Sequence, residues 1–341
     1  VCAGVCAAIC AQAGIAQAKS IAAAPAIEPA LRLNLIRRSL YRLTIGTMPF
    51  VRKSHSWKLR TRELALGGRT LVMGVLNVTP DSFSDGGQYL APEKAIAHAL
   101  KMLEEGADIL DIGGESTRPG KRAPLTPEAE QERVLGVIEG ILAAQPEAVI
   151  SIDTFHAETA RAAVATGAEI VNDVSGFLWD AGMAAACAEL GCGVVLMHAR
   201  GKPAEWASLP PLAANEVVPL VKRELAERAE AALVAGVARE RIVLDPGFGF
   251  GKIGDENYAL LAGFSELQEL GFPLLAGASR KSFLLRALAE CNSKEPGAKA
   301  RLYATIAAHT AAIVSGASVV RVHDVRAAVE AAAIADAILR G

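Results

Sequence analysis

Polar residues stand in this sequence wherever a short apolar run ends. One group carries cationic or protonatable side chains that suit a phosphate or diphosphate group: Arg118, Lys281, Arg321 and His323. A second group offers acceptor oxygens that suit the parallel N–H groups of a 2-amino-4-oxo pyrimidine edge: Asp153, Asn172 and Asp245. Buried charges are costly unless they are paired, so we expect these residues to share one site for a flat nitrogen heterocycle and a phosphate group.

The elements that must position these residues alternate along the chain from residue 70 onward. Eight short apolar runs, each typical of a strand buried on both faces, lie at 71–77, 108–112, 149–153, 169–173, 194–198, 242–245, 273–277 and 319–323. Helical patterns fill the intervals, and Thr126 followed by Pro127, with Glu130 close behind, predicts one capped helix start. The pattern predicts a (β/α)8 TIM barrel, in which the carboxyl ends of the strands carry the active site. A doubly wound open sheet is the alternative, but no G-x-G-x-x-G turn follows the first run.

Composition narrows the class of protein. The chain has 341 residues, of which 52% are apolar, and its 35 basic and 37 acidic residues give a net charge of −2. This balance does not favour a nucleic-acid partner, so any anion must be held locally. Three of the six cysteines lie within the first ten residues and the others are scattered, a pattern that does not indicate a disulfide framework in a chain of this length.

The first 47 residues differ from the rest. Residues 1–18 carry no charge and lack the basic start of a secretory signal, and they form a poor membrane span. Residues 31–43 combine arginines with leucines, as transit peptides or membrane-surface helices do. We favour the simpler interpretation that the natural start is Met48. The expected organisation is a single domain with an extension: 1–47 as the extension, 48–69 as a lead-in, and 70–341 as the barrel, in a cytoplasmic protein without a membrane anchor.

The sequence at the strand ends resembles the dihydropteroate synthase family of pterin-binding enzymes. The matching stretches are NVTPDSFSDGG at 77–87, GGESTRPG at 113–120, SIDT at 151–154, VND at 171–173, DPGFGFGK at 245–252, SRKS at 279–282 and RVHDV at 321–325. They stand in the family's order and spacing and cover the chain from about residue 70 to its end. The resemblance implies that the chain joins (7,8-dihydropterin-6-yl)methyl diphosphate to 4-aminobenzoate, giving 7,8-dihydropteroate and diphosphate in folate biosynthesis.

The resemblance also implies roles for individual residues. The pterin would be held by Asp153, Asn172, Asp245 and Lys281, with Arg321 over the ring face. Diphosphate would be held by Asn77, Arg321 and His323, with Thr117 and Arg118 closing over the reacting groups. Aminobenzoate would lie among Phe83, Pro119 and Ser282. The residues expected to act in catalysis are Asp153, Lys281, Arg321 and His323.

The implied mechanism needs no activated side-chain nucleophile. Mg²⁺, with Asn77 as its protein ligand, and the basic groups would stabilise diphosphate as it leaves. The charge of Asp153 would favour a cation-like pterin methylene, which the neutral aniline then attacks. The family further implies a homodimer that acts on small-molecule substrates.

Two other functions stay open on the sequence alone. A methyltetrahydrofolate methyltransferase-type barrel would share the Asp and Asn contacts to pterin. It should lack the long loop after the first apolar run, which begins at residue 77, and the SRKS stretch. A non-catalytic pterin-binding paralogue would keep the fold without turnover. The chain departs from the family pattern at Ala199, at Ala304 and at the pair Phe155 and His156, none of which is an expected ligand. His198 is expected to be a hydrogen-bonded residue of the rim rather than a catalytic one.

Overall fold

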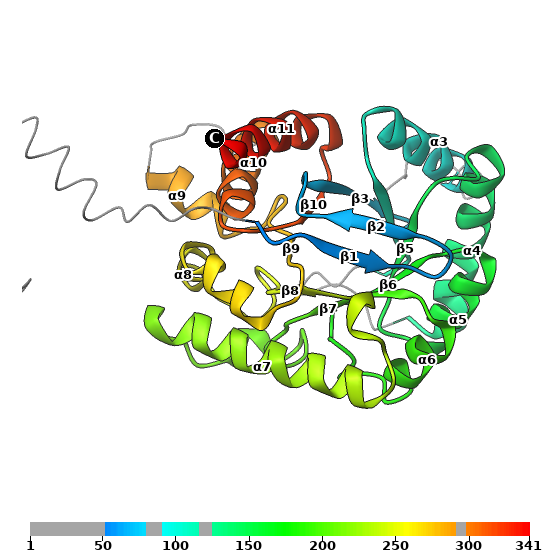
Figure 1. Cartoon of the computed structure of the whole chain (residues 1–341), viewed down its shortest axis with the longest axis horizontal. Helices are drawn as coiled ribbons and strands as arrows, with labels where there is room; N and C mark the ends of the chain where they lie inside the picture. The colour runs from blue at the N-terminus through cyan, green and yellow to red at the C-terminus, as the bar shows by residue number, and fades with distance from the viewer. Residues whose placement is uncertain (1–51, 80–90, 116–124, 291–297) are drawn as a thin grey trace, which may run out of the picture. The chain divides into compact units, whose positions relative to one another are not determined.

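The structure is a computed structural model that describes residues 52–79, 91–115, 125–290 and 298–341 (Figure 1). The expected extension at 1–47 lies outside the described residues, so its boundary stays a prediction. Among the described residues, no helix is both long enough and apolar enough to span a membrane.

Eight parallel strands form the centre of the molecule. They are β3 (Leu71–Asn77), β4 (Ile109–Gly113), β5 (Ile150–Asp153), β6 (Ile170–Asp173), β7 (Gly193–Met197), β8 (Ile242–Asp245), β9 (Leu275–Ala276) and β10 (Val319–Val322). Their order in the sheet is β8-β7-β6-β5-β4-β3-β10-β9, and a parallel bridge between Leu244 and Leu274 joins the two edges. The expected (β/α)8 barrel is thereby confirmed, and the open doubly wound sheet is wrong. Each strand lies within two residues of its expected position.

Helices surround the strands (Figure 1). They are α3 (Ala91–Glu104), α4 (Pro127–Ala144), α5 (Ala157–Thr166), α6 (Met183–Leu190), α7 (Ala214–Val234), α8 (Glu256–Ala262), α9 (Leu284–Glu290), α10 (Ala298–Val314) and α11 (Val325–Arg340), with 3-10 turns at Trp206–Ser208, Arg239–Arg241 and Phe264–Leu270. The expected cap of α4 is present, since Thr126 Oγ1 accepts from Ala129 N at 3.3 Å. The main apolar core lies between these helices and the outward face of the strands.

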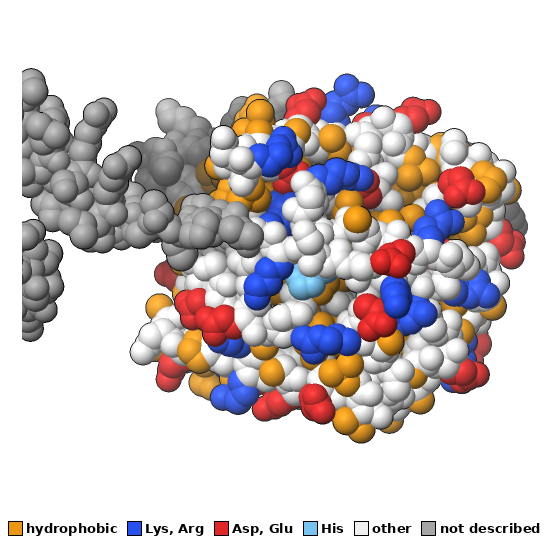
Figure 2. All heavy atoms as spheres, viewed as in Figure 1, with side chains coloured by type: hydrophobic (Ala, Val, Ile, Leu, Met, Phe, Trp, Pro, Cys, Tyr) orange, Lys and Arg blue, Asp and Glu red, His pale blue; other side chains and the backbone are white. Residues whose placement is uncertain are grey.

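A β-hairpin covers the N-terminal end of the barrel (Figure 1). The segment expected only as a lead-in forms two short antiparallel strands, β1 (His55–Lys58) and β2 (Glu63–Leu66). Trp57 is fully buried, packs on the apolar residues inside the barrel, and donates from Nε1 to Arg241 O at 2.8 Å. The hairpin therefore closes this end of the lumen. Figure 2 shows basic and acidic side chains interspersed over the same face, in keeping with the balanced net charge.

Candidate active site

The barrel interior changes character from one layer of side chains to the next. In the layer beside the hairpin, the strands contribute only apolar side chains: Met73, Ile109, Val149, Ile170, Val195, Val243, Leu275 and Val319. Side chains alternate along a strand, so the next inward layer lies two residues further on. The inward positions two residues further along the strands are Val75, Asp111, Ser151, Asn172, Met197, Asp245, Gly277 and Arg321. The lumen thus becomes polar toward the carboxyl ends of the strands, where a barrel enzyme has its active site.

Arg321 is the centre of a charged network in this layer. Its Nε donates to Asp111 Oδ2 at 2.5 Å, and its Nη2 donates to Asp153 Oδ2. Asn172 joins the same network, because its Nδ2 donates to Asp111 Oδ2 at 3.0 Å. The structure therefore brings together Asp153, Asn172 and Arg321, as the sequence predicts, and adds Asp111.

Asp111 was not expected at this site from the sequence. It lies inside an apolar run rather than at its end, and a strand buried on both faces gives no sign of which side chains point inward. The signal that could have found it is the charge itself, since a carboxylate within a buried strand must have a partner.

Two carboxyl groups of the site have raised pKa values. Burial raises the pKa of Asp153 to about 7; Arg321 opposes this shift, and the nearby Asp111 and Glu130 carboxylates add to it. Burial likewise raises the pKa of Asp245 to about 6, against the hydrogen bond from Gly247 and the charges of Lys281 and Arg321. Both groups change charge near neutral pH, which is typical of functional sites.

A glycine-rich loop after β8 fixes Asp245. Gly247 N donates to Asp245 Oδ1 at 2.7 Å, so one carboxylate oxygen is engaged by the loop itself. The buried Lys252 donates from Nζ to the carbonyl oxygens of His198, Gly247 and Phe250 at 3.0, 2.7 and 3.1 Å. Lys252 thereby ties the loops after β7 and β8 together, a role that sequence reasoning did not assign.

The loop after β9 brings Lys281 and His323 to the same rim. Lys281 Nζ lies 4.0 Å from the centre of the Phe250 ring, a cation–π contact that directs the ammonium group over the loop after β8. Ser279 Oγ lies 2.9 Å from His323 Nδ1, which holds the imidazole ring at the end of β10. Ser282 is exposed, two residues before α9.

His198 is a hydrogen-bonded residue of the rim, as expected. It is fully buried, and its Nε2 lies 3.0 Å from Glu224 Oε2. Burial holds its pKa well below the usual value, with the cations Lys252 and Arg228 acting in the same direction. The ring is therefore a neutral structural element of the rim.

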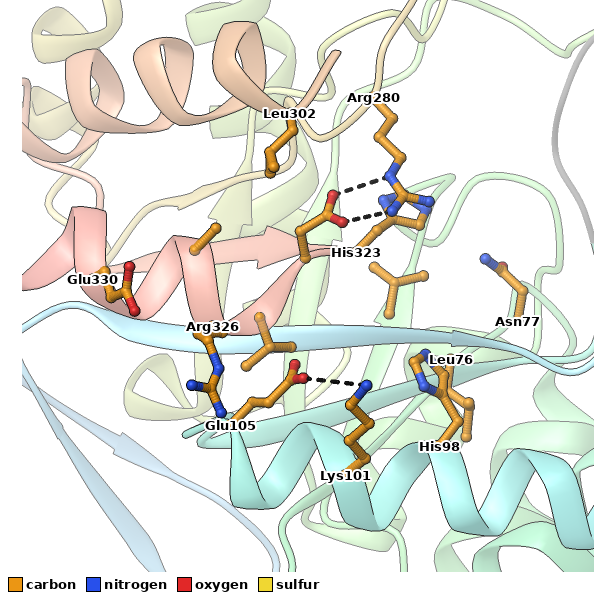
Figure 3. A pocket seen from close by; sticks show the side chains of 14 residues that line it. Leu76, Asn77, His98, Lys101, Glu105, Arg280, Leu302, His323, Arg326 and Glu330 are labelled. Atoms are coloured by element: carbon orange, nitrogen blue, oxygen red, sulfur yellow. Dashed lines mark hydrogen bonds and ion pairs between the residues drawn. The ribbon is translucent and has the colours of Figure 1, made fainter. Parts of the chain in front are cut away.

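Asn77 and His323 line one cavity of about 680 Å³ (Figure 3). The cavity extends from the end of β3 between α3 and the start of α11, and its walls carry Lys101, Arg280 and Arg326. Ion pairs hold two of these cations, Lys101 to Glu105 and Arg280 to Asp324. A polar space of this kind beside Asn77 has room for a phosphate-bearing group.

A second polar cluster lies next to the end of β4. Glu130, expected only as part of a helix start, is buried; its Oε2 accepts from Thr154 Oγ1 at 2.8 Å and lies 3.0 Å from His156 Nδ1. Glu115 completes a group whose ligand-capable atoms lie within 4.8 Å of one another. Burial raises the pKa of Glu115, and the charge of Glu130 adds to this shift. Through Glu130, the cluster joins the start of α4 to the segment that follows Asp153.

The remaining expected residues belong to loops outside the described residues. These residues are Phe83, Thr117, Arg118 and Pro119. Their positions relative to the rim therefore stay predictions.

Comparisons with known proteins agree with this geometry. Residues 73–323 match the family described as pterin binding enzyme. The dihydropteroate synthase of Mycobacterium leprae is 47% identical over 268 residues, which are 79% of this chain and 93% of that protein.

Two solved structures from Xanthomonas albilineans are also similar. A dihydropteroate synthase with 4-aminobenzoic acid is 45% identical with a TM-score of 0.75, and the match covers 84% of this chain and 98% of that one. A dihydropteroate synthase in complex with 7,8-dihydropteroate is 43% identical with a TM-score of 0.71, over 83% and 98% of the two chains. From the barrel, its polar strand ends and these matches together, we conclude that the chain belongs to the dihydropteroate synthase family of pterin-binding enzymes.

Proposed function

We propose that this chain catalyses the dihydropteroate synthase reaction. The amine of 4-aminobenzoate attacks the methylene of (7,8-dihydropterin-6-yl)methyl diphosphate, the bond from that carbon to the diphosphate oxygen breaks, and the amine loses a proton. The products are 7,8-dihydropteroate and diphosphate. The observation that carries the proposal is the hydrogen-bonded group that Arg321 and Asn172 form with Asp111 in the lumen, together with Asp245 at the end of β8.

The pterin lies in the lumen in this proposal. Asp245 accepts from the 2-amino group and the adjacent ring N–H with the carboxylate oxygen that Gly247 does not engage. Lys281 donates to the carbonyl oxygen at C4 and the nearby ring nitrogen, and Arg321 covers the ring face. The Asp153 carboxylate stands beside the methylene, where its negative charge favours the cation-like transition state. Support comes from the relatives, since X. albilineans proteins bind the aminobenzoate substrate and the dihydropteroate product.

Diphosphate occupies the outer part of the site. Arg321 and His323 donate to its oxygens, with Thr117 and Arg118 as further donors from the loop that follows β4. Asn77 would hold Mg²⁺ through its side-chain oxygen, because this ion prefers one or two protein oxygens together with substrate phosphate oxygens. When bound, it supplies positive charge that neutralises the leaving diphosphate. The Glu115 cluster suits Mg²⁺ less well, because His156 contributes a nitrogen and Glu130 is already hydrogen-bonded.

The aminobenzoate site forms at the mouth of the barrel. Phe83, Pro119 and Ser282 enclose the flat ring in this proposal, and the loops that carry the first two exclude water from the reacting carbon.

A diphosphate-release assay tests the function. We expect release from the pterin diphosphate that depends on both 4-aminobenzoate and Mg²⁺, with 7,8-dihydropteroate identified by mass. A protein that binds dihydropterin tightly but releases no diphosphate would be a non-catalytic paralogue. Methyl transfer from methyltetrahydrofolate to a corrinoid would indicate the methyltransferase alternative.

The other expectations follow from the family alone. We propose a cytoplasmic homodimer without a nucleic-acid partner, to be checked by sedimentation and cell fractionation. We also propose that a chain beginning at Met48 folds and is active, because none of the proposed site residues precedes it. Loss of solubility or activity in that shortened chain would contradict this division of the sequence.

A further inference from the structure

Asp111 contacts two residues of the proposed pterin site but is itself out of a ligand's reach. Its side chain is 0% exposed, whereas those of Arg321 and Asp153 are 18% and 16% exposed. The same oxygen, Oδ2, accepts from both Arg321 Nε and Asn172 Nδ2. Any effect of Asp111 on a bound ligand must therefore pass through these two neighbours.

We propose that Asp111 is a positioning residue, which fixes the amide orientation of Asn172 and the guanidinium plane of Arg321. The proposal rests on the function proposed above and deepens it. A side-chain amide can turn over and exchange its donor and acceptor. A carboxylate accepts only from the nitrogen, so Asp111 leaves the carbonyl oxygen of Asn172 for an N–H group of the heterocycle.

Arg321 is held in a similar way. Asp111 takes Nε and Asp153 takes Nη2, so two carboxylates on β4 and β5 fix the fork of the guanidinium group. A long side chain that is fixed before the ligand arrives loses less entropy when the ligand binds. Asp111 thus orients both the Asn172 amide, which contacts the edge of the pterin ring, and the Arg321 guanidinium group, which covers its face.

Structural stability does not account for Asp111. Its Oδ1 is buried and has no hydrogen-bond partner among the described residues, and the same holds for Oγ of Ser151, its neighbour in register. A buried carboxylate with one unsatisfied oxygen destabilises a fold unless something else compensates. Its two hydrogen bonds both go to residues of the proposed site, which is where we place its role.

The charge of Asp111 gives a second, measurable effect. Four charged groups act on Asp153. One is a cation, Arg321 on β10, and three are carboxylates: Asp111 on β4, Glu130 on α4 and Asp173 on β6. All three carboxylates favour the protonated form of Asp153. Removing the charge of Asp111 lowers the pKa of Asp153, so the Asp153 carboxylate stays ionised to lower pH. This titration reports the charge of Asp111, whereas its two hydrogen bonds are tested by comparing a variant that can keep them with one that cannot.

Two substitutions separate orientation from charge. Asp111→Asn can keep both hydrogen bonds through its single oxygen while removing the charge. Asp111→Leu removes the bonds and the charge and keeps the branched shape of the side chain. Asp108→Asn is the matched control: it removes a carboxylate that bonds Arg69 and Val72 N at the other end of the same strand region. The measurements are the affinity for 7,8-dihydropterin by calorimetry as a function of pH, and thermal unfolding.

The expected results differ among the three proteins. Asp111→Leu weakens dihydropterin binding at least about tenfold, because the Asn172 amide is free to turn. Asp111→Asn binds normally at alkaline pH, and its loss of affinity on acidification begins at lower pH than in the unsubstituted protein. Asp108→Asn changes neither property, although it can lower the unfolding temperature.

Two outcomes overturn the proposal. One is normal dihydropterin affinity in an Asp111→Leu protein that unfolds cooperatively. The other is a loss of dihydropterin affinity on acidification that begins at the same pH in Asp111→Asn as in the unsubstituted protein. This result also decides the matter if the leucine variant does not fold. Both measurements need binding only, so they remain decisive even if the diphosphate-release assay shows no turnover.

Discussion

The two ends of the barrel consist of the same strands but are filled in opposite ways. Beside the β1–β2 hairpin, the lumen is apolar and Trp57 is completely buried in it. Two residues further along the same strands, the lumen holds Asp111, Asn172, Asp245 and Arg321. The apolar end stabilises the fold through burial, whereas the polar end keeps charges at a cost in desolvation. Stability and function are therefore separated along the barrel axis, and this separation can be tested.

The largest expected effect concerns the apolar end. Trp57→Ala removes a large side chain from a closed core and should lower the free energy of unfolding by about 3–5 kcal/mol. The affinity for dihydropterin should not change, because Trp57 lies a layer or more away from the proposed ligand. Denaturant unfolding and calorimetry measure the two quantities.

A tryptophan at the other end is the matched control. Trp206 packs edge-on against Phe250 with ring centres 5.4 Å apart, and Phe250 lies under Lys281. Trp206→Ala should therefore weaken pterin binding as well as stability. Similar losses of pterin affinity in both variants would show that the two ends are not separate.

The next effect concerns the polar end. Asp245→Asn replaces a carboxylate oxygen by a donor that faces the N–H groups of the pterin, which should cost about 2–4 kcal/mol of binding free energy. The free energy of unfolding should rise, because a costly buried carboxylate is removed. Unchanged pterin affinity in the folded variant would refute the assignment of this residue.

A smaller effect appears in the pH dependence. The pKa of Asp245 is about 6 in the fold, above its ordinary value, so the folded chain binds this proton more tightly than the unfolded chain does. The destabilisation is therefore full above pH 6 and is relieved as the pH falls below it. The stability gap between Asp245→Asn and the unsubstituted protein should be widest above pH 6 and narrow on acidification. Comparing the two proteins cancels the opposite contribution of buried neutral histidines such as His309, whose pKa is about 4. A gap that is constant with pH would contradict the proposed ionisation.

The smallest effect concerns the metal. Asn77→Ala should raise the Mg²⁺ concentration needed for half-maximal diphosphate release without changing dihydropterin affinity, since substrate oxygens supply most of the ion's ligands. Full activity of the unsubstituted protein in excess chelator would refute the requirement.

Much of the barrel could be predicted because its strands are continuous apolar runs with polar ends. Those ends correctly identified Asp153, Asn172, Asp245, Lys281, Arg321 and His323 as residues of one rim. The hairpin was not predicted, because four-residue strands such as His55–Lys58 carry too little periodicity to stand out. Asp111 was missed because inward and outward positions become visible only when strand register is known.

Glu130 shows a different limit of the sequence. Its place in the first turn of α4 predicted a role at the helix start, yet the side chain turns inward to Thr154 and His156. Those partners lie on another element, and no local pattern reports such a tertiary contact.

The hairpin that closes the N-terminal end also has a kinetic consequence. A lumen that is closed at one end has a single entrance, so the reactant that binds deepest in it must bind first and leave last. A heterocycle held by Asn172 and Asp245 would be trapped beneath the second reactant until the joined product escapes. Initial-rate patterns should then be those of a compulsory order of addition, and an excess of the second reactant should slow the reaction by occupying the entrance ahead of its turn.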